Sequence, residues 1–233
     1  MKKIALITGG TRGIGRALAI EMSKQGYLVI ITYLSSDGEA LKLNNEYGIV
    51  TIKADVSNYA KMQSVITSII NDYGKIDVVI NNAGIAPTQK LLIDASESEF
   101  DRVMGVNFKG VYNVCKNVIP YMLSDVGVIV NVSSVQGVRG GSCEVIYSAS
   151  KSAVIGFTRA LSEELENSDI TIFSVAPTLT DTDMNAHLSI EDKLNFIKES
   201  GLTKIPTAND VAKKIIALIC GGKSSHGKNF EIY

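Results

Sequence analysis

The 233-residue chain is poor in the residues that form disulfides and metal sites. Its three cysteines, Cys115, Cys143 and Cys220, are odd in number and far apart, which predicts free thiols in a reducing compartment and no metal site. The only histidines are His187 and His226, and neither is assigned a role. No glycine-flanked nucleophile serine occurs, which excludes a serine hydrolase of the α/β-hydrolase type.

Long apolar runs and an excess of one charge are also missing. No apolar stretch reaches the ~20 residues of a membrane span, and the apolar start of the chain is too short for a signal peptide. The 23 basic and 24 acidic residues give a net charge of −1. That balance favours neither nucleic acid nor a membrane as partner. We therefore expect a cytoplasmic protein without either partner.

Short β-branched runs alternate with longer helical patterns along the chain. Six near-continuous apolar runs are typical of parallel strands covered on both faces: Ile4–Thr8, Leu28–Tyr33, Val50–Ala54, Val78–Asn81, Val128–Ser133 and Thr171–Ala176. Helices are expected near 14–25, 38–47, 58–73, 97–122 and 147–167, followed by a helix at Asn209–Cys220 and a strand at Asn229–Ile232.

This alternation predicts an α/β fold with one domain over residues 1–233. Parallel neighbours need long right-handed crossovers, so we expect a Rossmann-type doubly wound parallel sheet of about seven strands with helices on both faces. The long stretch Pro177–Pro206 contains a short helical pattern, Ile190–Lys198. It is either a lid over a binding site or a surface excursion without a role.

The first expected strand runs through a glycine-rich turn directly into a helix. The turn reads Thr8-Gly9-Gly10-Thr11-Arg12-Gly13-Ile14-Gly15. Glycines let the backbone turn tightly and approach a pyrophosphate, and a helix N-terminus offers free N–H groups and a positive dipole end. The turn predicts a dinucleotide site; a strand-to-helix turn without a ligand is the alternative.

The end of the second expected strand bears on which nicotinamide dinucleotide binds. NAD sites usually place an acid there for the ribose 2′-hydroxyl, but this strand ends in tyrosine, leucine and two serines, with no acid before Asp37. The missing acid, Arg12 in the turn and the hydroxyl of Ser35 favour NADP(H), because arginine binds phosphate through charge-assisted hydrogen bonds. The alternative is that Arg12 faces solvent and Asp37 binds the ribose.

Two further segments follow the third and fourth expected strands. Ala54-Asp55-Val56 lies where an adenine would be, and Asn81-Asn82-Ala83-Gly84 closes the fourth strand. Both are also ordinary turn sequences, so each is a weak signal alone.

A tyrosine and a lysine carry the strongest chemical signal. Tyr147 and Lys151 are four residues apart on an expected helix, so both lie on one face. Ser134 follows the fifth strand, at the sheet edge where ligands bind in open α/β sheets. Asn107 is a further polar residue among apolar neighbours.

Together these motifs resemble the short-chain dehydrogenase/reductase family in order and interval, over essentially the whole chain. The resemblance is closest to the branch of 3-oxoacyl-(acyl-carrier-protein) reductases, enzymes of fatty acid biosynthesis. It implies NADPH-dependent reduction of a carbonyl, in a 3-oxoacyl thioester or a small ketone, with Tyr147 as proton donor. It also implies a homotetramer or homodimer paired through helices 97–122 and 147–167, whose apolar residues exceed a single stripe: Val111, Tyr112, Val114, Val154, Ile155 and Phe157.

The resemblance also implies a role for each site residue. Lys151 would lower the pKa of Tyr147 and hold the nicotinamide ribose, and Ser134 would hydrogen-bond the carbonyl oxygen. Asn107 would hold a water that links Lys151 to solvent, or would be structural. After the sixth strand, the residues expected at the cofactor are Pro177, Thr180 and Thr182, while Thr178 stands where the family has glycine.

Other readings of the motifs stay open. The substrate could be another small alcohol or ketone, such as a diketone, sugar or steroid, and a non-catalytic NADP-binding regulator is a second class. Related carrier-protein reductases have basic residues just before the fifth and sixth strands, where this sequence has Asp125 and Asp169. Acidic groups would repel an acidic carrier, which favours a small substrate.

Overall fold

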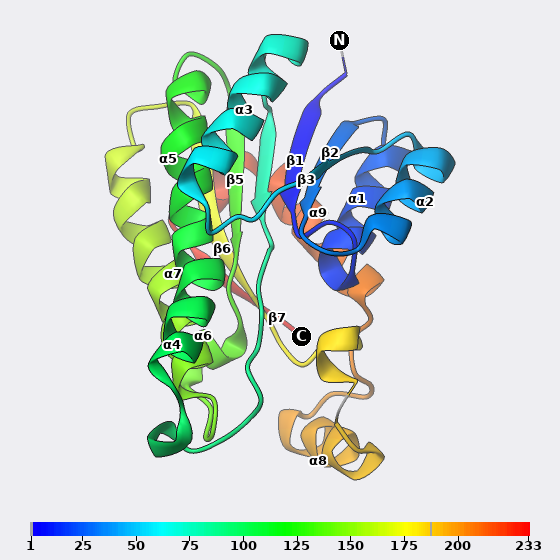
Figure 1. Ribbon diagram of the computed structural model, residues 1–233, viewed down its shortest axis with the longest axis vertical. Coiled ribbons are helices and arrows are strands. Elements are labelled where there is room, and N and C mark those ends of the chain that lie inside the picture. Colours follow the sequence, from blue (N-terminus) through cyan, green and yellow to red (C-terminus); the bar gives the residue numbers. More distant parts are fainter. Residues whose placement is uncertain (1, 187) are drawn as a thin grey trace.

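All seven strands of the computed structural model, which describes residues 2–186 and 188–233, form one parallel sheet. The order is β3-β2-β1-β4-β5-β6-β7, which reverses direction at β1 and so is doubly wound (Figure 1). The strands are β1 Ile4–Thr8, β2 Leu28–Tyr33, β3 Val50–Lys53, β4 Val78–Asn81, β5 Gly127–Val132, β6 Ile170–Pro177 and β7 Asn229–Ile232. The predicted Rossmann-type fold is confirmed. His187 lies outside the described residues.

Helices cover both faces of this sheet. One face packs against α1 (Gly13–Lys24), α2 (Asp37–Tyr47) and α9 (Ala208–Cys220), and the other against α3 (Tyr59–Tyr73), α5 (Gly110–Met122) and α7 (Val145–Glu164). Each layer has its own apolar core, so strands such as β1 are buried along their whole length. Burial on both faces explains why the strands read as continuous apolar runs.

The helix expected over 97–122 is interrupted in the structure. It consists of α4 (Glu97–Met104), a π-helical segment (Gly105–Lys109) and α5. The π segment contains Asn107, whose side chain bonds to the main chain of Ile85 outside the helix. Such π segments are rare and frequently mark functional sites.

The carboxyl edge of the sheet carries further short elements. A five-residue helix, α6 (Val135–Arg139), follows β5, and a 3₁₀ turn (Asp183–Asn185) and α8 (Ile190–Ser200) follow β6. In Figure 1, α8 extends below the sheet and away from the helix layers. No helix in the part of the chain that the structure describes has the length and apolar character needed to cross a membrane.

One expectation about the surface needs correction, whereas two acidic residues lie where the sequence places them. Four of the six apolar residues assigned to a subunit contact are instead buried in the chain's own core: Val111, Val114, Val154 and Ile155. Asp125 and Asp169 are exposed beside the first residues of β5 and β6, whereas Ser134 follows the last residue of β5. The two acids therefore lie at the edge opposite Ser134, so their charges do not border that end of the sheet.

Candidate functional site

The glycine turn brings β1 and α1 close to the β4 loop. Gly9 and Gly13 adopt positive φ angles of 65° and 52°, which favour glycine. A Cβ on Gly15 would lie 2.4 Å from the main-chain oxygen of Gly9, too close for any side chain. The first turn of α1 has no side-chain cap, so its N–H groups are available to an anion.

Thr8 and Asn82 hold this turn against the β4 loop. Thr8 Oγ1 accepts hydrogen bonds from the main-chain N–H groups of Asn82 and Ala83, both 3.0 Å long. Asn82 Nδ2 donates in return to the carbonyl oxygens of Thr8 and Gly9, at 3.0 and 3.2 Å. Three residues expected at the cofactor thus lie together, and Thr8, which the sequence did not single out, fixes them.

A cavity of about 530 Å³ opens beside the turn. Its walls include four residues expected at the cofactor: Thr11, Arg12, Gly13 and Thr182. Arg16 and Glu39 also line it and were not expected; they form a 3.4 Å ion pair. A cavity of this size, with an uncapped helix start and two guanidinium groups, fits the phosphates of a dinucleotide.

After the end of β2, the Asp37 carboxylate is bonded to other side chains, whereas Ser35 is exposed. Asp37 forms an ion pair of 2.8 Å with Lys53 and accepts a 3.1 Å hydrogen bond from the Tyr33 hydroxyl. These contacts lower the pKa of Asp37. Ser35 is exposed. The carboxylate that the alternative reading assigned to the ribose is therefore already engaged.

The remaining cofactor candidates form tight turns. Asp55 Oδ1 accepts from the main-chain N–H and hydroxyl of Ser57, at 2.8 and 2.7 Å, and the carbonyl of Val56 accepts from Asn113 at 2.8 Å. Thr180 is buried and donates its hydroxyl to the carbonyl of Thr178 at 2.8 Å. Pro177 is the last residue of β6. These bonds shape the loops, and only Thr182 of this group borders the cavity beside the turn.

Ser134, Tyr147 and Lys151 converge at the carboxyl end of β5. Ser134 is the first residue before α6, and its Oγ accepts a 3.2 Å hydrogen bond from the N–H of Gln136. Its hydroxyl also lies near Tyr147 on α7, where it acts to lower the pKa of the phenol. Lys151 is 4% exposed, and its Nζ lies 5.9 Å from the centre of the Tyr147 ring. The three residues therefore form one cluster, as their spacing predicts.

Burial dominates the protonation of this cluster. It raises the pKa of Tyr147 to about 12, an effect that the nearby Ser134 hydroxyl opposes and the negative charge of Glu144 increases. Burial also lowers the pKa of Lys151 to about 8. The Lys151 amine donates to the Val132 carbonyl, and desolvation of the phenol is the largest influence on Tyr147, so the lowering of the Tyr147 pKa by Lys151 stays a prediction.

Asn107 ties the π segment to the β4 loop. Its Nδ2 donates to the Ile85 carbonyl at 2.9 Å and to the Ser150 hydroxyl at 3.0 Å, and its Oδ1 accepts from the Ile85 N–H at 2.8 Å. A Cβ on Gly84 would lie 3.3 Å from Lys151 Nζ and 3.4 Å from Asn107 Oδ1. Asn107, Gly84 and Lys151 therefore border the same space. The side chain has a structural role, and its binding of a water that links Lys151 to solvent stays a prediction.

Known proteins resemble this chain over nearly its whole length. Residues 3–193 match the short chain dehydrogenase family. The chain is 37% identical over 214 residues to the 3-oxoacyl-(acyl-carrier-protein) reductase FabG of Staphylococcus aureus, which covers 89% of this chain and 85% of the relative. The reductase of the same name from Chlamydia trachomatis is 34% identical over 230 residues, covering 96% and 92%.

Solved structures agree with this match. A 3-ketoacyl-(acyl-carrier-protein) reductase from Brucella melitensis, complexed with NADH, superposes with a TM-score of 0.91 at 27% identity, covering 99% of this chain and 96% of that one. ElxO with NADP bound superposes with a TM-score of 0.84 at 29% identity, covering 100% and 97%. The chain belongs to the short-chain dehydrogenase family and is an oxidoreductase that acts on CH–OH groups.

Proposed function

We propose that the protein reduces the carbonyl of a 3-oxoacyl thioester or small ketone to an alcohol, using NADPH. The observation that carries this proposal is the cluster at the end of β5, where the Tyr147 hydroxyl meets Ser134 with Lys151 buried beside them. The names of the relatives, which are 3-oxoacyl reductases, support the substrate class.

The cavity beside the glycine turn would hold the dinucleotide. Gly9, Gly13 and the N–H groups that start α1 would meet the pyrophosphate, and Thr182 lies against Gly13 from the other side. When bound, the nicotinamide supplies a hydride. NADPH is favoured over NADH because Arg12 lines the cavity, Ser35 is exposed and Asp37 is already paired with Lys53.

Three side chains would then manage the proton and the developing charge. Tyr147 gives its phenolic proton to the carbonyl oxygen, and a pKa of about 12 keeps that proton in place at neutral pH. The Ser134 hydroxyl donates to the same oxygen and stabilises negative charge as it develops. Lys151, with a pKa of about 8, exchanges protons readily near neutrality and is placed to restore the phenol.

Assembly into a homodimer or homotetramer forms part of the same proposal. The helices that would pair still expose large aromatic side chains. Tyr112 on α5 is one of the residues first expected there, and Phe100 on α4 and Tyr121 on α5 are additional. Exposed apolar groups concentrated on neighbouring helices are typical of contact surfaces.

Replacement of Tyr147 tests the chemistry. Tyr147→Phe keeps the ring and removes only the donor, so NADPH binding should persist while turnover of ethyl acetoacetate and acetoacetyl-CoA falls about 10²–10⁴-fold. Tyr121→Phe, an exposed tyrosine far along α5, is the matched control and should keep full activity. Turnover near the wild-type rate in Tyr147→Phe would refute the assignment.

A further inference from the structure

The segment that precedes α7 is fastened to the loop that follows β4. Cys143 has a φ of 62°, the only positive value at a non-glycine position in the described chain, and its carbonyl accepts a 3.0 Å hydrogen bond from the N–H of Lys90. Gln89 Nε2 donates to Glu144 Oε1 at 3.1 Å. Strained backbone persists only where the surroundings hold it, and here two cross-loop bonds do so, directly before the helix of Tyr147.

Glu144 is the charged residue of this segment that lies nearest to Tyr147 along the chain. It is the N-cap residue of α7, three positions before Tyr147, and residues at that spacing are neighbours on a helix surface. Its negative charge raises the pKa of Tyr147, so its field reaches the phenol. Its Oε2 and the Gln136 side chain both lie against Gly141, at 2.8 and 3.0 Å from the position of an added Cβ. Glu144 thus sits on the rim formed by the segments that carry Ser134 and Tyr147.

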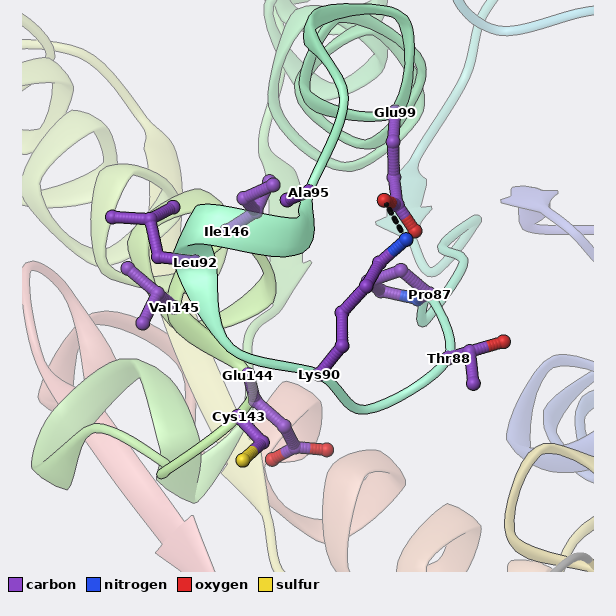
Figure 2. Close-up of a pocket in the computed structure, with 10 residues that line it drawn as sticks. All are labelled: Pro87, Thr88, Lys90, Leu92, Ala95, Glu99, Cys143, Glu144, Val145 and Ile146. Atoms are coloured by element: carbon purple, nitrogen blue, oxygen red, sulfur yellow. Dashed lines mark ion pairs between the residues drawn. The ribbon is translucent and has the colours of Figure 1, made fainter.

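The carboxylate of Glu144 is not neutralised. Lys90, a cation that lines the same small cavity as Glu144, directs its Nζ to Glu99 in an ion pair of 2.6 Å. This small cavity lies between the loop after β4 and the start of α7. Figure 2 shows Lys90 and Glu99 together on one side of this cavity, with the Glu144 carboxylate beside Cys143 on the other. Glu144 has no ion pair within residues 2–186 and 188–233, and its partner Gln89 is uncharged. A full negative charge therefore remains at the rim.

We propose that Glu144 is a specificity-determining residue that selects uncharged carbonyl substrates over those with a carboxylate next to the reacting group. The proposal rests on the proposed function, because it takes Tyr147 as the group that meets the carbonyl oxygen. An anionic substrate would bring a second negative charge to the rim, where it would repel the Glu144 carboxylate. An ester or thioester of the same acid has no such charge.

The test compares a neutral and an anionic form of one substrate. Ethyl acetoacetate and acetoacetate differ in charge beside the same ketone, and kcat/KM with NADPH is measured for both. Wild-type protein should favour the ester. Glu144→Gln keeps the shape and a hydrogen-bonding group, and it should raise kcat/KM for acetoacetate by about 10-fold, which corresponds to one unit of screened charge at short range. The ester should change less than about twofold.

Glu163→Gln is the matched control. It removes the same charge from an exposed position on α7, nineteen residues or about 28 Å further along the helix. Glu163→Gln should leave kcat/KM unchanged for both substrates. Glu144→Ala replaces the glutamine variant if thermal unfolding shows that the latter is unstable.

The outcomes separate this inference from the proposed function. If wild-type protein reduces neither compound, the proposed function is wrong and the selection falls with it. If wild-type protein reduces the ester but Glu144→Gln changes kcat/KM for both substrates by the same factor, Glu144 acts through Tyr147 or the fold. The specificity role is then wrong. An effect of equal size in Glu163→Gln would also overturn it, since net charge alone would then suffice.

Discussion

The side-chain amine of Lys151 donates a 2.9 Å hydrogen bond to the main-chain carbonyl of Val132, the last residue of β5. This bond crosses from α7 to the sheet two residues before Ser134 and fixes the lysine under the reacting groups. The acceptor is neutral, and Lys151 has no carboxylate partner within the described ranges 2–186 and 188–233. Burial without a counter-charge is what lowers the pKa of Lys151 to about 8.

The first prediction concerns the stability of the protein without cofactor. The folded-state pKa of Lys151 is depressed to about 8 from 10.5, so between these values the unfolded chain binds the proton more tightly. Stability therefore rises with pH across this window. Relative to Lys151→Met, wild-type protein should gain about 2 kcal/mol of unfolding free energy between pH 7 and pH 9.5, measured by urea denaturation.

Lys116→Met provides the control for that measurement. Lys116 is an exposed lysine on α5, so its loss should leave the pH dependence of unfolding unchanged. If the difference in unfolding free energy between Lys151→Met and wild type stayed constant from about pH 7 to pH 9.5, the pKa of Lys151 would not be lowered in the folded chain, and the prediction would be wrong.

Much of the fold could be predicted from the sequence because parallel strands are buried on both faces. β1 and β2 have the expected limits, and β5 ends only one residue earlier than expected, at Val132. The cluster of Ser134, Tyr147 and Lys151 was predictable for a similar reason: helical spacing and the end of a parallel strand dictate where each residue points.

What could not be predicted depends on contacts between distant segments. The π segment at Asn107 exists because that side chain bonds to Ile85, which no local pattern encodes. Likewise the raised pKa of Tyr147 follows from burial, which depends on the packing of α6 and the β4 loop around it. Val154 and Ile155 were misread as contact residues because their burial depends on tertiary packing, and Val154 lies in the core between α7 and the sheet.

The second prediction concerns the glycine turn. A Cβ at position 15 would meet the Gly9 carbonyl and Asn82 Nδ2, both at 2.4 Å, so Gly15→Ala must displace the turn. It should destabilise the protein by about 1–3 kcal/mol and weaken dinucleotide binding. Gly38→Ala is the control: nothing lies within 4 Å of its added Cβ in α2, and it should stabilise by about 0.5–1 kcal/mol. Equal effects of the two changes in thermal unfolding would contradict the proposed role of the turn.

The third prediction concerns assembly. Tyr112 is 42% exposed on α5, one of the helices expected to pair. Light scattering at micromolar concentration should give the mass of a dimer or tetramer, and Tyr112→Glu should shift it towards the monomer, because a charge would be buried without a partner. A control change at Tyr59, an equally sized exposed side chain on α3, should leave the mass unchanged. A monomer in the wild-type protein would end this part of the proposal.

The last prediction concerns the choice between NADPH and NADH. Arg12 is the residue before α1 and lines the cavity beside the turn, where its guanidinium can pair with a 2′-phosphate. A hydrogen-bonded charge pair contributes about 1.5–3 kcal/mol, so Arg12→Ala should weaken NADPH binding by roughly 10- to 100-fold in calorimetric titration. NADH, which lacks the phosphate, should bind almost unchanged. Arg102→Ala removes an equal charge from the exposed end of α4 and should affect neither cofactor. If wild-type protein binds both cofactors equally, or if Arg12→Ala weakens both by the same factor, then Arg12 supports the turn rather than the phosphate, and the preference for NADPH is wrong.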